Sequence, residues 1–351
     1  IFFPTVLVLY FLLPQKFRPA FLLIASYYFY INIKPVYALL LAGVTLTTYF
    51  FTNLIDKAKS EKKKRQLLIA DIIITLLPLF FFKYFNFVNE GVFTLLNYAG
   101  LHLPLPHISL LLPVGISFYT FMALGYAIDV YNEEIEAEKN FGIVALFLSF
   151  FPIVMSGPIE RATNMFHQLK GKLEFKYDMV VSGLQLMLWG YFMKLALADR
   201  ISIYIDAVFK NVEQHVGSSL LLATLMQPIR VYGDLGGYSL IAIGCAKVMG
   251  VNIIPNFNRP FFATTMSEFW RRWHMSLIKW LTDYVYTPLA FNFRKYGVWG
   301  IALALNLTFI ISGIWHGAAL NFIVWGAIQG IALSFETFTR KGKDAFEEKF
   351  R

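Results

Sequence analysis

Long apolar runs separated by short polar segments recur along the whole chain and predict membrane-spanning helices. The longest, residues 298–335, contains no Asp, Glu, Lys or Arg, and its one group that titrates near neutral pH is His316. As a single helix it would extend about 57 Å, nearly twice the roughly 30 Å of a bilayer's hydrocarbon core, so it predicts two spans or one broken span. A histidine in such a run is a functional-site hypothesis by default, the alternative being a structural core histidine. The nearby Gly313 and Gly317 would let backbone or substrate approach its ring.

The same pattern predicts about ten or eleven helices in all. Residues 141–155 are apolar but short and lead into a Gly-Pro and a Glu-Arg pair, which is typical of a re-entrant element rather than a full crossing. Residues 200–211 predict an amphipathic helix. We expect the other membrane helices at residues 4–13, 20–33, 36–55, 67–87, 110–130, 177–198 and 220–251.

Composition extends this picture to the whole chain. Of its 351 residues, 57% are hydrophobic and 15% are charged, whereas charged residues make up about a quarter of an ordinary globular protein. The mean hydropathy is +0.56. These values predict a single all-α, polytopic integral membrane domain over residues 1–351, in contact with membrane lipids.

The net charge of +9 is partly concentrated in one short segment. Residues 57–65 carry six Lys or Arg against a single acidic residue, Glu61. Short loops rich in Lys and Arg are retained on the cytoplasmic side of a membrane. The excess charge therefore predicts topology, and we expect no nucleic-acid partner.

Few residues offer disulfide or metal chemistry. Cys245 is the one cysteine of the sequence, which excludes an intramolecular disulfide and a cysteine-cluster metal site. His102 and His107 lie five apart in a proline-rich segment, but no third ligand is near in sequence, so a surface loop is favoured and no metal is expected. The chain begins at Ile1 without the basic segment or cleavage site of a signal peptide, and we expect a first membrane helix whose start is missing.

Two oppositely charged residues lie near the middle of one predicted span, residues 220–251. Arg230 and Asp234 lie four apart in the string RVYGDLGGYS, beside three glycines. Because ionisable groups inside a membrane normally pair, we expect an Arg230–Asp234 ion pair lining a cavity. The GDLGG string is not a phosphate-binding loop, since the Lys-Ser/Thr that such a loop requires does not follow it.

Residues 267–289, SEFWRRWHMSLIKWLTDYVYTPL, predict an amphipathic helix capped by Ser267. Its basic side and its three tryptophans are typical of a helix at the membrane interface. It either lies on lipid headgroups or forms a cationic, aromatic-rimmed mouth for an anionic acyl carrier such as a CoA or phosphopantetheine thioester. His274 cannot be assigned to a face of this helix. The residues that would form the mouth include Arg271, Arg272 and Trp273.

The string FWRRWHMSLIKWLTDYVYTPL followed by SGIWHGAALNFIVWG strongly resembles the membrane-bound O-acyltransferase family, and most closely its bacterial alginate O-acetyltransferase branch. PVGISFYTFMALGYAIDVY, FPIVMSGPIERATNMFHQL and NFNRPFFATTMSEFW are similar to that branch in order and spacing, so the resemblance covers residues 4–336. It implies many helices around a tunnel through the bacterial cytoplasmic (inner) membrane. In that tunnel a cytoplasmic acyl donor would meet an outward-facing acceptor.

The resemblance assigns two histidines and shows three departures. The family's near-invariant histidine falls on His316, and its second conserved polar position falls on His274. Where the branch often reads FDFSGYSD, this chain has YGDLGGYSL, which leaves Asp234 as the acid there. The usual WG-x-x-HG becomes WGAIQG, with Gln329 in place of a histidine. Branch members usually continue beyond the point where this chain stops, at Arg351, so either the protein is short or its ends are trimmed.

These assignments predict acyl transfer by general base catalysis. His316 would remove the proton of the attacking hydroxyl, for which a neutral imidazole is required. His274 would orient the acyl group or donate a hydrogen bond to the developing oxyanion. No serine lies in a G-x-S-x-G elbow, so the hydroxyl would belong to a polysaccharide or to a serine of a partner protein. The donor, acetyl-CoA or a phosphopantetheine-type thioester, would be a substrate, and no bound cofactor is expected.

Partners and alternatives follow from the same reasoning. The branch implies a separate extracytoplasmic acetyl-esterase-like partner that completes delivery to a cell-surface polysaccharide. The alternative within the family is a D-alanyl transferase for teichoic acids, whose donor is a carrier protein. The alternative from another class is a transporter or channel with Arg230, Asp234 and His316 along its pathway.

Overall fold

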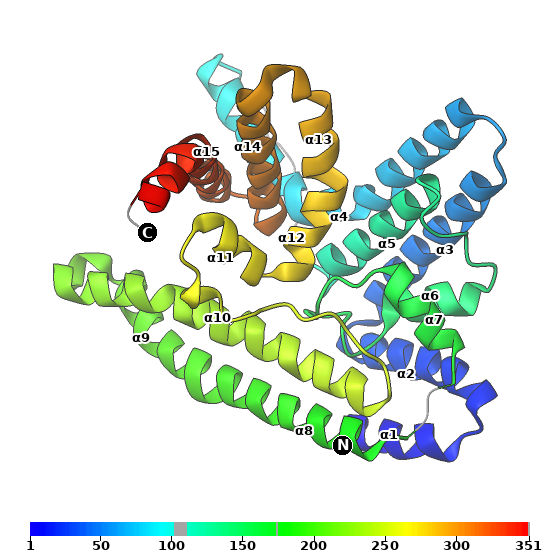
Figure 1. Ribbon diagram of the computed structural model, residues 1–351. Coiled ribbons are helices and arrows are strands. Elements are labelled where there is room, and N and C mark those ends of the chain that lie inside the picture. The colour runs from blue at the N-terminus through cyan, green and yellow to red at the C-terminus, as the bar shows by residue number, and fades with distance from the viewer. Residues whose placement is uncertain (102–110, 173–174, 350–351) are drawn as a thin grey trace.

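The computed structural model describes residues 1–101, 111–172 and 175–349, and this part of the chain is helical with no strand (Figure 1). The predicted all-α fold is confirmed. The described residues form fifteen α-helices, more than the ten or eleven expected, because several apolar runs are divided by breaks.

Among the described helices, five are long and apolar enough to cross a membrane. They span Pro35–Lys57, Glu61–Tyr98, Tyr177–Lys210, Arg294–His316 and Leu320–Arg340. The prediction of a multi-pass membrane protein is therefore confirmed, by length and composition.

The first seven helices form one bundle, coloured blue to green in Figure 1. Its core contains fully buried aromatic side chains, among them Tyr30, Tyr119 and Phe147. The Tyr30 hydroxyl donates a hydrogen bond of 2.6 Å to the carbonyl oxygen of Val114, so a buried polar group is satisfied before α5 begins. The helices are α1 (Phe2–Leu12), α2 (Arg18–Ile33), α3 (Pro35–Lys57), α4 (Glu61–Tyr98), α5 (Ile116–Tyr131), α6 (Phe141–Ser149) and α7 (Ala162–Lys170).

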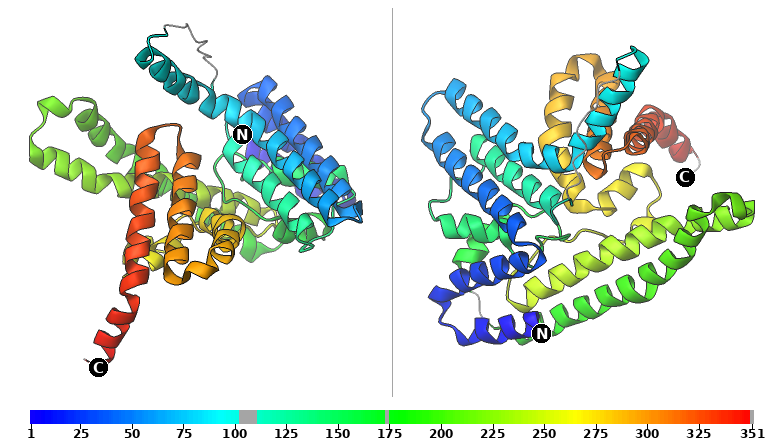
Figure 2. Two further views of the ribbon diagram at one scale, coloured as in Figure 1. Left: turned by 90° about the horizontal axis from the view of Figure 1, so that it is seen from above. Right: turned by 180° about the vertical axis from the view of Figure 1, so that it is seen from behind.

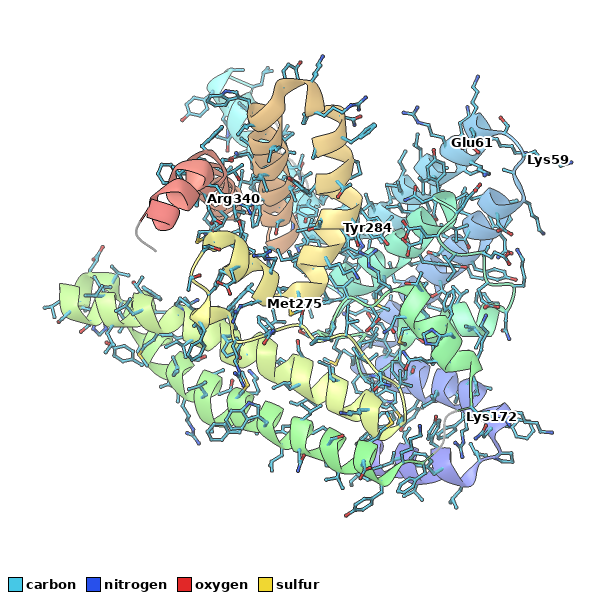
Figure 3. All side chains as sticks on the ribbon, in the orientation of Figure 1. Lys59, Glu61, Lys172, Met275, Tyr284 and Arg340 are labelled. Atoms are coloured by element: carbon cyan, nitrogen blue, oxygen red, sulfur yellow. The ribbon has the colours of Figure 1, made fainter. Side chains whose placement is uncertain are left out.

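The segment predicted to be re-entrant is indeed too short to cross a bilayer, since α6 has nine residues. The loop after it is embedded in the protein by charge pairing. Arg161 lies 2.8 Å from a carboxylate oxygen of Asp283, and its guanidinium lies 4.1 Å from the ring centre of Tyr284, which Figure 3 labels. Arg161 of the Glu-Arg pair thus joins this loop to the π-helical segment Thr282–Tyr286.

The next helices form a long hairpin, coloured green to yellow-green in Figure 1, held together by glycines. A Cβ on Gly190 would lie 2.6 Å from the carbonyl oxygen of Gly237, and one on Gly244 would lie 2.5 Å from that of Gly183. Helices can approach this closely only where side chains are absent. The GDLGG string therefore serves helix packing. The elements are α8 (Tyr177–Tyr191), a π-helical segment (Phe192–Ala198), α9 (Asp199–Lys210) and α10 (Gly217–Val248).

The predicted Arg230–Asp234 ion pair is wrong. Arg230 pairs with Asp206 of α9 at 2.8 Å, and Asp234 pairs with Lys194 of the π-helical segment at 2.6 Å. The two residues lie on one helix, but oppositely charged groups of the neighbouring helix offer each a partner. These bridges fasten α10 to the helices before it.

The remaining helices make up the C-terminal part of the fold. Figure 2 shows α14 and α15 side by side as a second hairpin, with the end of α15 extending beyond it. The elements are α11 (Met266–Arg272), α12 (Met275–Leu281), a π-helical segment (Thr282–Tyr286), α13 (Thr287–Asn292), α14 (Gly297–His316) and α15 (Leu320–Lys349).

Candidate active site

The apolar run at residues 298–335 forms two helices, which confirms the expected break. His316 is the last residue of α14, Gly317 continues in extended backbone, and α15 begins at Leu320. His316 therefore stands at a helix end, where backbone carbonyls lack partners within the helix.

Glycines allow the two helices of this hairpin to meet next to His316. A Cβ on Gly313 would lie 2.2 Å from the carbonyl oxygen of Phe322, and one on Gly317 would lie 2.1 Å from the Phe322 ring. Farther along, a Cβ on Gly326 would lie 2.3 Å from the carbonyl oxygen of Phe309. The turn that presents His316 thus depends on residues without side chains.

Two side chains of helix α4 bind the C-terminal end of α14. The Lys83 ammonium donates to the carbonyl oxygen of Trp315 and lies 3.5 Å from the Ser117 hydroxyl. The Tyr84 hydroxyl donates a 2.7 Å hydrogen bond to the carbonyl oxygen of Ile314. A cation at a helix C-terminus is stabilised by the helix dipole. Two unpaired carbonyls immediately before His316 are thereby satisfied.

The single amphipathic helix predicted at residues 267–289 is wrong in two respects. Thr265, not Ser267, caps it, because the Thr265 hydroxyl accepts the amide hydrogen of Glu268 at 3.0 Å. The helix also breaks after Arg272, and His274 has a left-handed backbone with φ of 45°. Its amphipathic periodicity is therefore interrupted where the candidate histidine stands.

The tryptophans of this segment face the protein more than the membrane surface. Trp270 and Trp280 are only 7% and 6% exposed. The Trp270 ring packs on Phe309 of α14 and on Trp325 of α15, with centroid distances of 5.0 and 5.8 Å. A helix lying flat on lipid headgroups would expose these rings, so this part of the interfacial interpretation is wrong.

A cavity of about 560 Å³ lies between α10, α11 and the α14–α15 hairpin. His316 is exposed to it, and its ring centre lies 5.2 Å from that of Trp325. Apart from the tryptophan indoles, the other polar side chains in its described lining are amides. The lining residues are Gln227, Pro228, Val231, Phe269, Trp270, Trp273, His316, Asn321, Phe322, Trp325 and Gln329.

His274 lies beside this cavity but is buried, with 2% of its surface exposed. Its ring centre lies 6.5 Å from that of His316. Its Nδ1 is 3.1 Å from the side-chain oxygen of Asn256. Burial lowers the pKa of the His274 imidazole far below its ordinary value, so the ring is neutral at pH 7. Met275, labelled in Figure 3, marks the start of α12 directly after it.

A comparison with known proteins gives the family of this chain. The model of the MBOAT, or membrane-bound O-acyltransferase, family matches residues 137–349, which include both histidines. The chain belongs to this family. The match begins before α6 and continues to the end of the described chain, so the MBOAT pattern covers every wall of the cavity.

Individual MBOAT relatives differ in what their names say they modify. The chain is 35% identical over 341 residues to a probable alginate O-acetylase AlgI of Pseudomonas aeruginosa, covering 96% of this chain and 64% of that protein. It is 32% identical to a peptidoglycan O-acetyltransferase of Helicobacter pylori, covering 91% and 64%. It is 27% identical to a teichoic acid D-alanyltransferase of Bacillus subtilis, covering 77% and 68%. The chain thus spans about two thirds of the length of these relatives.

The structure brings together only some of the predicted site residues. His316 and Trp273 line the cavity, and His274 lies beside it. Arg272 pairs with Glu268 at 2.5 Å, and Arg271 is exposed; neither lines the cavity. Nor do Arg230 and Asp234 line this cavity, and each is paired with a residue of another element. The predicted loop histidines His102 and His107 lie outside the described residues.

Three residues that the sequence did not single out line this cavity or contact its neighbouring histidine. Gln329, noted only as a departure from the branch pattern, lines the cavity together with Gln227. Asn256 bonds His274 and is the first residue of the quoted string NFNRPFFATTMSEFW. Asn256 could have been selected from the sequence, because it is a polar residue inside a string that resembles the family branch. For Gln227 the sequence gives no signal.

Proposed function

We propose that this protein is a membrane O-acetyltransferase. It would move an acetyl group from a cytoplasmic thioester donor to a hydroxyl of an extracytoplasmic polysaccharide or of a partner protein. The observation that carries this proposal is an accessible His316 in a 560 Å³ cavity, with a second, buried and neutral histidine 6.5 Å from it. Relatives named for O-acetylation of alginate and of peptidoglycan support the reaction class.

In the proposed reaction His316 is the general base. Its imidazole takes the proton of the acceptor hydroxyl while the oxygen attacks the thioester carbonyl carbon. The carbon–sulfur bond then breaks, the thiolate receives the proton from His316, and the products are an ester and a free thiol. General base catalysis of this kind contributes typically 10²–10⁴-fold to a rate. The described cavity lining holds no Ser, Thr or Cys, which supports direct transfer without an acyl-enzyme.

The cavity also supports an uncharged acyl group. Its described lining has no carboxylate, whereas a D-alanyl group carries an ammonium that would need a partner when taken out of water. The named D-alanyltransferase is also less similar, at 27% identity against 35% for the alginate relative. Acetyl-CoA or a phosphopantetheine-type thioester is the donor that we propose, as a substrate and not as a bound cofactor.

The proposed surroundings are those of the family branch. The basic segment at residues 57–65 supports an orientation with this loop in the cytoplasm of a bacterium, the protein residing in the inner membrane. A separate extracytoplasmic acetyl-esterase-like protein would complete delivery to the cell-surface polysaccharide. Among the comparisons, the names alginate O-acetylase and peptidoglycan O-acetyltransferase agree with a polymeric acceptor.

Turnover of the donor tests this proposal against the transporter alternative. We expect proteoliposomes that contain the protein and a hydroxyl acceptor to release free thiol from acetyl-CoA and to form an acetyl ester, measured by thiol reagent and by mass spectrometry. Movement of solute without thiol release would contradict the enzyme and favour the transporter. Transfer from a D-alanyl carrier protein alone would favour the D-alanyl transferase.

The two arginines at the C-terminal end of α11 give a second prediction. We expect Arg271→Gln combined with Arg272→Gln to raise the donor KM several-fold with a smaller change in kcat, if these cations attract the phosphates of the donor. Initial rates in detergent measure both constants. Arg200→Gln, at an exposed arginine of α9, is the matched control. An unchanged KM in the double variant would return the two arginines to an interaction with lipid headgroups.

A further inference from the structure

Asn256 is the centre of a fully buried hydrogen-bond network around His274. Asn256, His274, Ser276 and Ser239 are each no more than 2% exposed. The Asn256 side-chain oxygen is 3.1 Å from Nδ1 of His274 and accepts a 2.8 Å hydrogen bond from the Ser276 hydroxyl. Its amide nitrogen donates to the Ser239 hydroxyl at 3.0 Å. The Asn256 amide and the two serine hydroxyls are shielded from bulk solvent, so they make their hydrogen bonds within the network.

The orientation of the Asn256 amide follows from backbone donors, whose hydrogens are fixed. The Ser276 backbone N–H donates to the Asn256 side-chain oxygen at 3.3 Å, which only an oxygen can accept. The Ile159 backbone N–H donates to the Ser276 hydroxyl at 3.0 Å, which leaves that hydroxyl's own hydrogen for Asn256. If the amide were turned round, its NH₂ would face these donors. The oxygen therefore faces His274.

The tautomer of His274 is a consequence of this orientation. An amide oxygen has no hydrogen to give, so Nδ1 of His274 must carry the proton that joins them. Because the buried ring is neutral, its other nitrogen, Nε2, then has a lone pair and no hydrogen. A neutral His274 held in this way accepts a hydrogen bond at Nε2. It cannot donate one to an oxyanion from that atom.

The distance to His316 fits an accepting role. The two ring centres are 6.5 Å apart, too far for a direct hydrogen bond between nitrogens, and one oxygen atom between the rings could be bonded to both. When His316 takes the hydroxyl proton it carries a hydrogen on both nitrogens. One of these returns to the thiolate. The other, which the neutral ring already carried, needs an acceptor, and the described lining offers neutral amide oxygens but no carboxylate.

We propose that Asn256 is a positioning residue that fixes His274 in its Nδ1–H tautomer, so that Nε2 of His274 accepts, through one bridging water, the hydrogen bond of the His316 N–H that is not transferred and stabilises His316 when its other nitrogen takes the substrate proton. This inference rests on the proposed function and refines it. The hydrogen bond from His274 to the oxyanion, expected from the family resemblance, is replaced by an acceptor role. Asn256 acts through His274 and does not touch the substrate.

Three variants separate positioning from general support of the fold. Asn256→Leu removes the acceptor and is expected to lower kcat about ten- to a hundredfold, with little change in KM. Asn256→Asp keeps an oxygen acceptor for Nδ1 and is expected to restore most of kcat. Ser239→Ala removes only the partner at the far end of the same amide and is the matched control, with a small effect expected. Equal loss in Asn256→Asp and Asn256→Leu, with both proteins folded, would overturn the proposal.

A spectroscopic measurement tests the tautomer without turnover. The sequence has six histidines, so ¹⁵N-histidine labelling gives few signals, and the signal of His274 is the one lost in His274→Gln. We expect a protonated Nδ1 and an unprotonated Nε2 in the wild-type protein. A protonated Nε2 would overturn the inference even if Asn256→Leu fails to fold. The expected tautomer in a protein that transfers no acyl group would uphold the assignment and overturn the proposed function instead.

Discussion

His316→Ala is expected to lower kcat for acetyl transfer by at least about a hundredfold, the smallest contribution usual for a positioned general base. The reason is geometric, because among the described cavity-lining residues His316 is the one whose side chain has a basic nitrogen. The variant should insert into the membrane at normal levels, since its neighbours Trp315 and Ile314 are held through their backbone carbonyls. Thiol release in proteoliposomes and mass spectrometry of surface glycans are the measurements.

The control for that experiment is another histidine. His167 lies exposed on α7, with Nδ1 3.2 Å from the Thr163 carbonyl oxygen, and does not line the cavity. His167→Ala should therefore retain transfer. Near-normal acetylation of the acceptor by His316→Ala would remove His316 from the mechanism.

Gly313→Ala should destabilise the protein and abolish most activity, although alanine usually favours helices over glycine by up to about 1 kcal/mol. The new Cβ would lie 2.2 Å from the carbonyl oxygen of Phe322, a backbone atom that cannot rotate away. Overpacking of this kind costs about 1–3 kcal/mol, which exceeds the gain in helix propensity. The strain is three residues from His316, and a displacement of about 1 Å at a catalytic group can cost a hundredfold in rate.

Thermal unfolding in detergent measures this effect against a matched glycine. Gly43, in the middle of α3, has no atom within 4 Å of the position that a Cβ would take. Gly43→Ala should leave Tm unchanged or raise it slightly, while Gly313→Ala lowers it by several degrees. The same Tm for both variants would show that α14 and α15 can separate at Gly313 without cost.

Local hydrophobic patterns in the sequence predicted much of the fold. The apolar runs at residues 36–55 and 298–335 correspond to α3 and to the α14–α15 hairpin. These were predictable because the length of an apolar run can be compared with the thickness of the bilayer without knowing the rest of the fold. The break beside His316 was also predictable, from a run too long for one crossing. The apolar run had singled out His316, and the family resemblance added His274, which periodicity alone could not have paired with it.

What the sequence could not supply depends on contacts between distant segments. The break at His274 has no proline or glycine to mark it. It is fixed by Asn256, whose backbone oxygen accepts the amide hydrogen of Met275 at 2.8 Å. Likewise Arg230 and Asp234 are well spaced for each other, but Asp206 and Lys194 reach them from other elements. The spacing of charged residues along one helix does not reveal partners on other helices that the fold brings close.

The left-handed backbone of His274, with φ of 45°, restricts what evolution or an experimenter can place there. Side chains that branch at Cβ are strongly disfavoured in that conformation, whereas Gly, Asn, Asp and His accept it most readily. Asparagine is therefore the replacement that retains the chain path and removes the imidazole. Loss of function in His274→Asn would report on the ring, whereas the same loss in His274→Val would report on the turn.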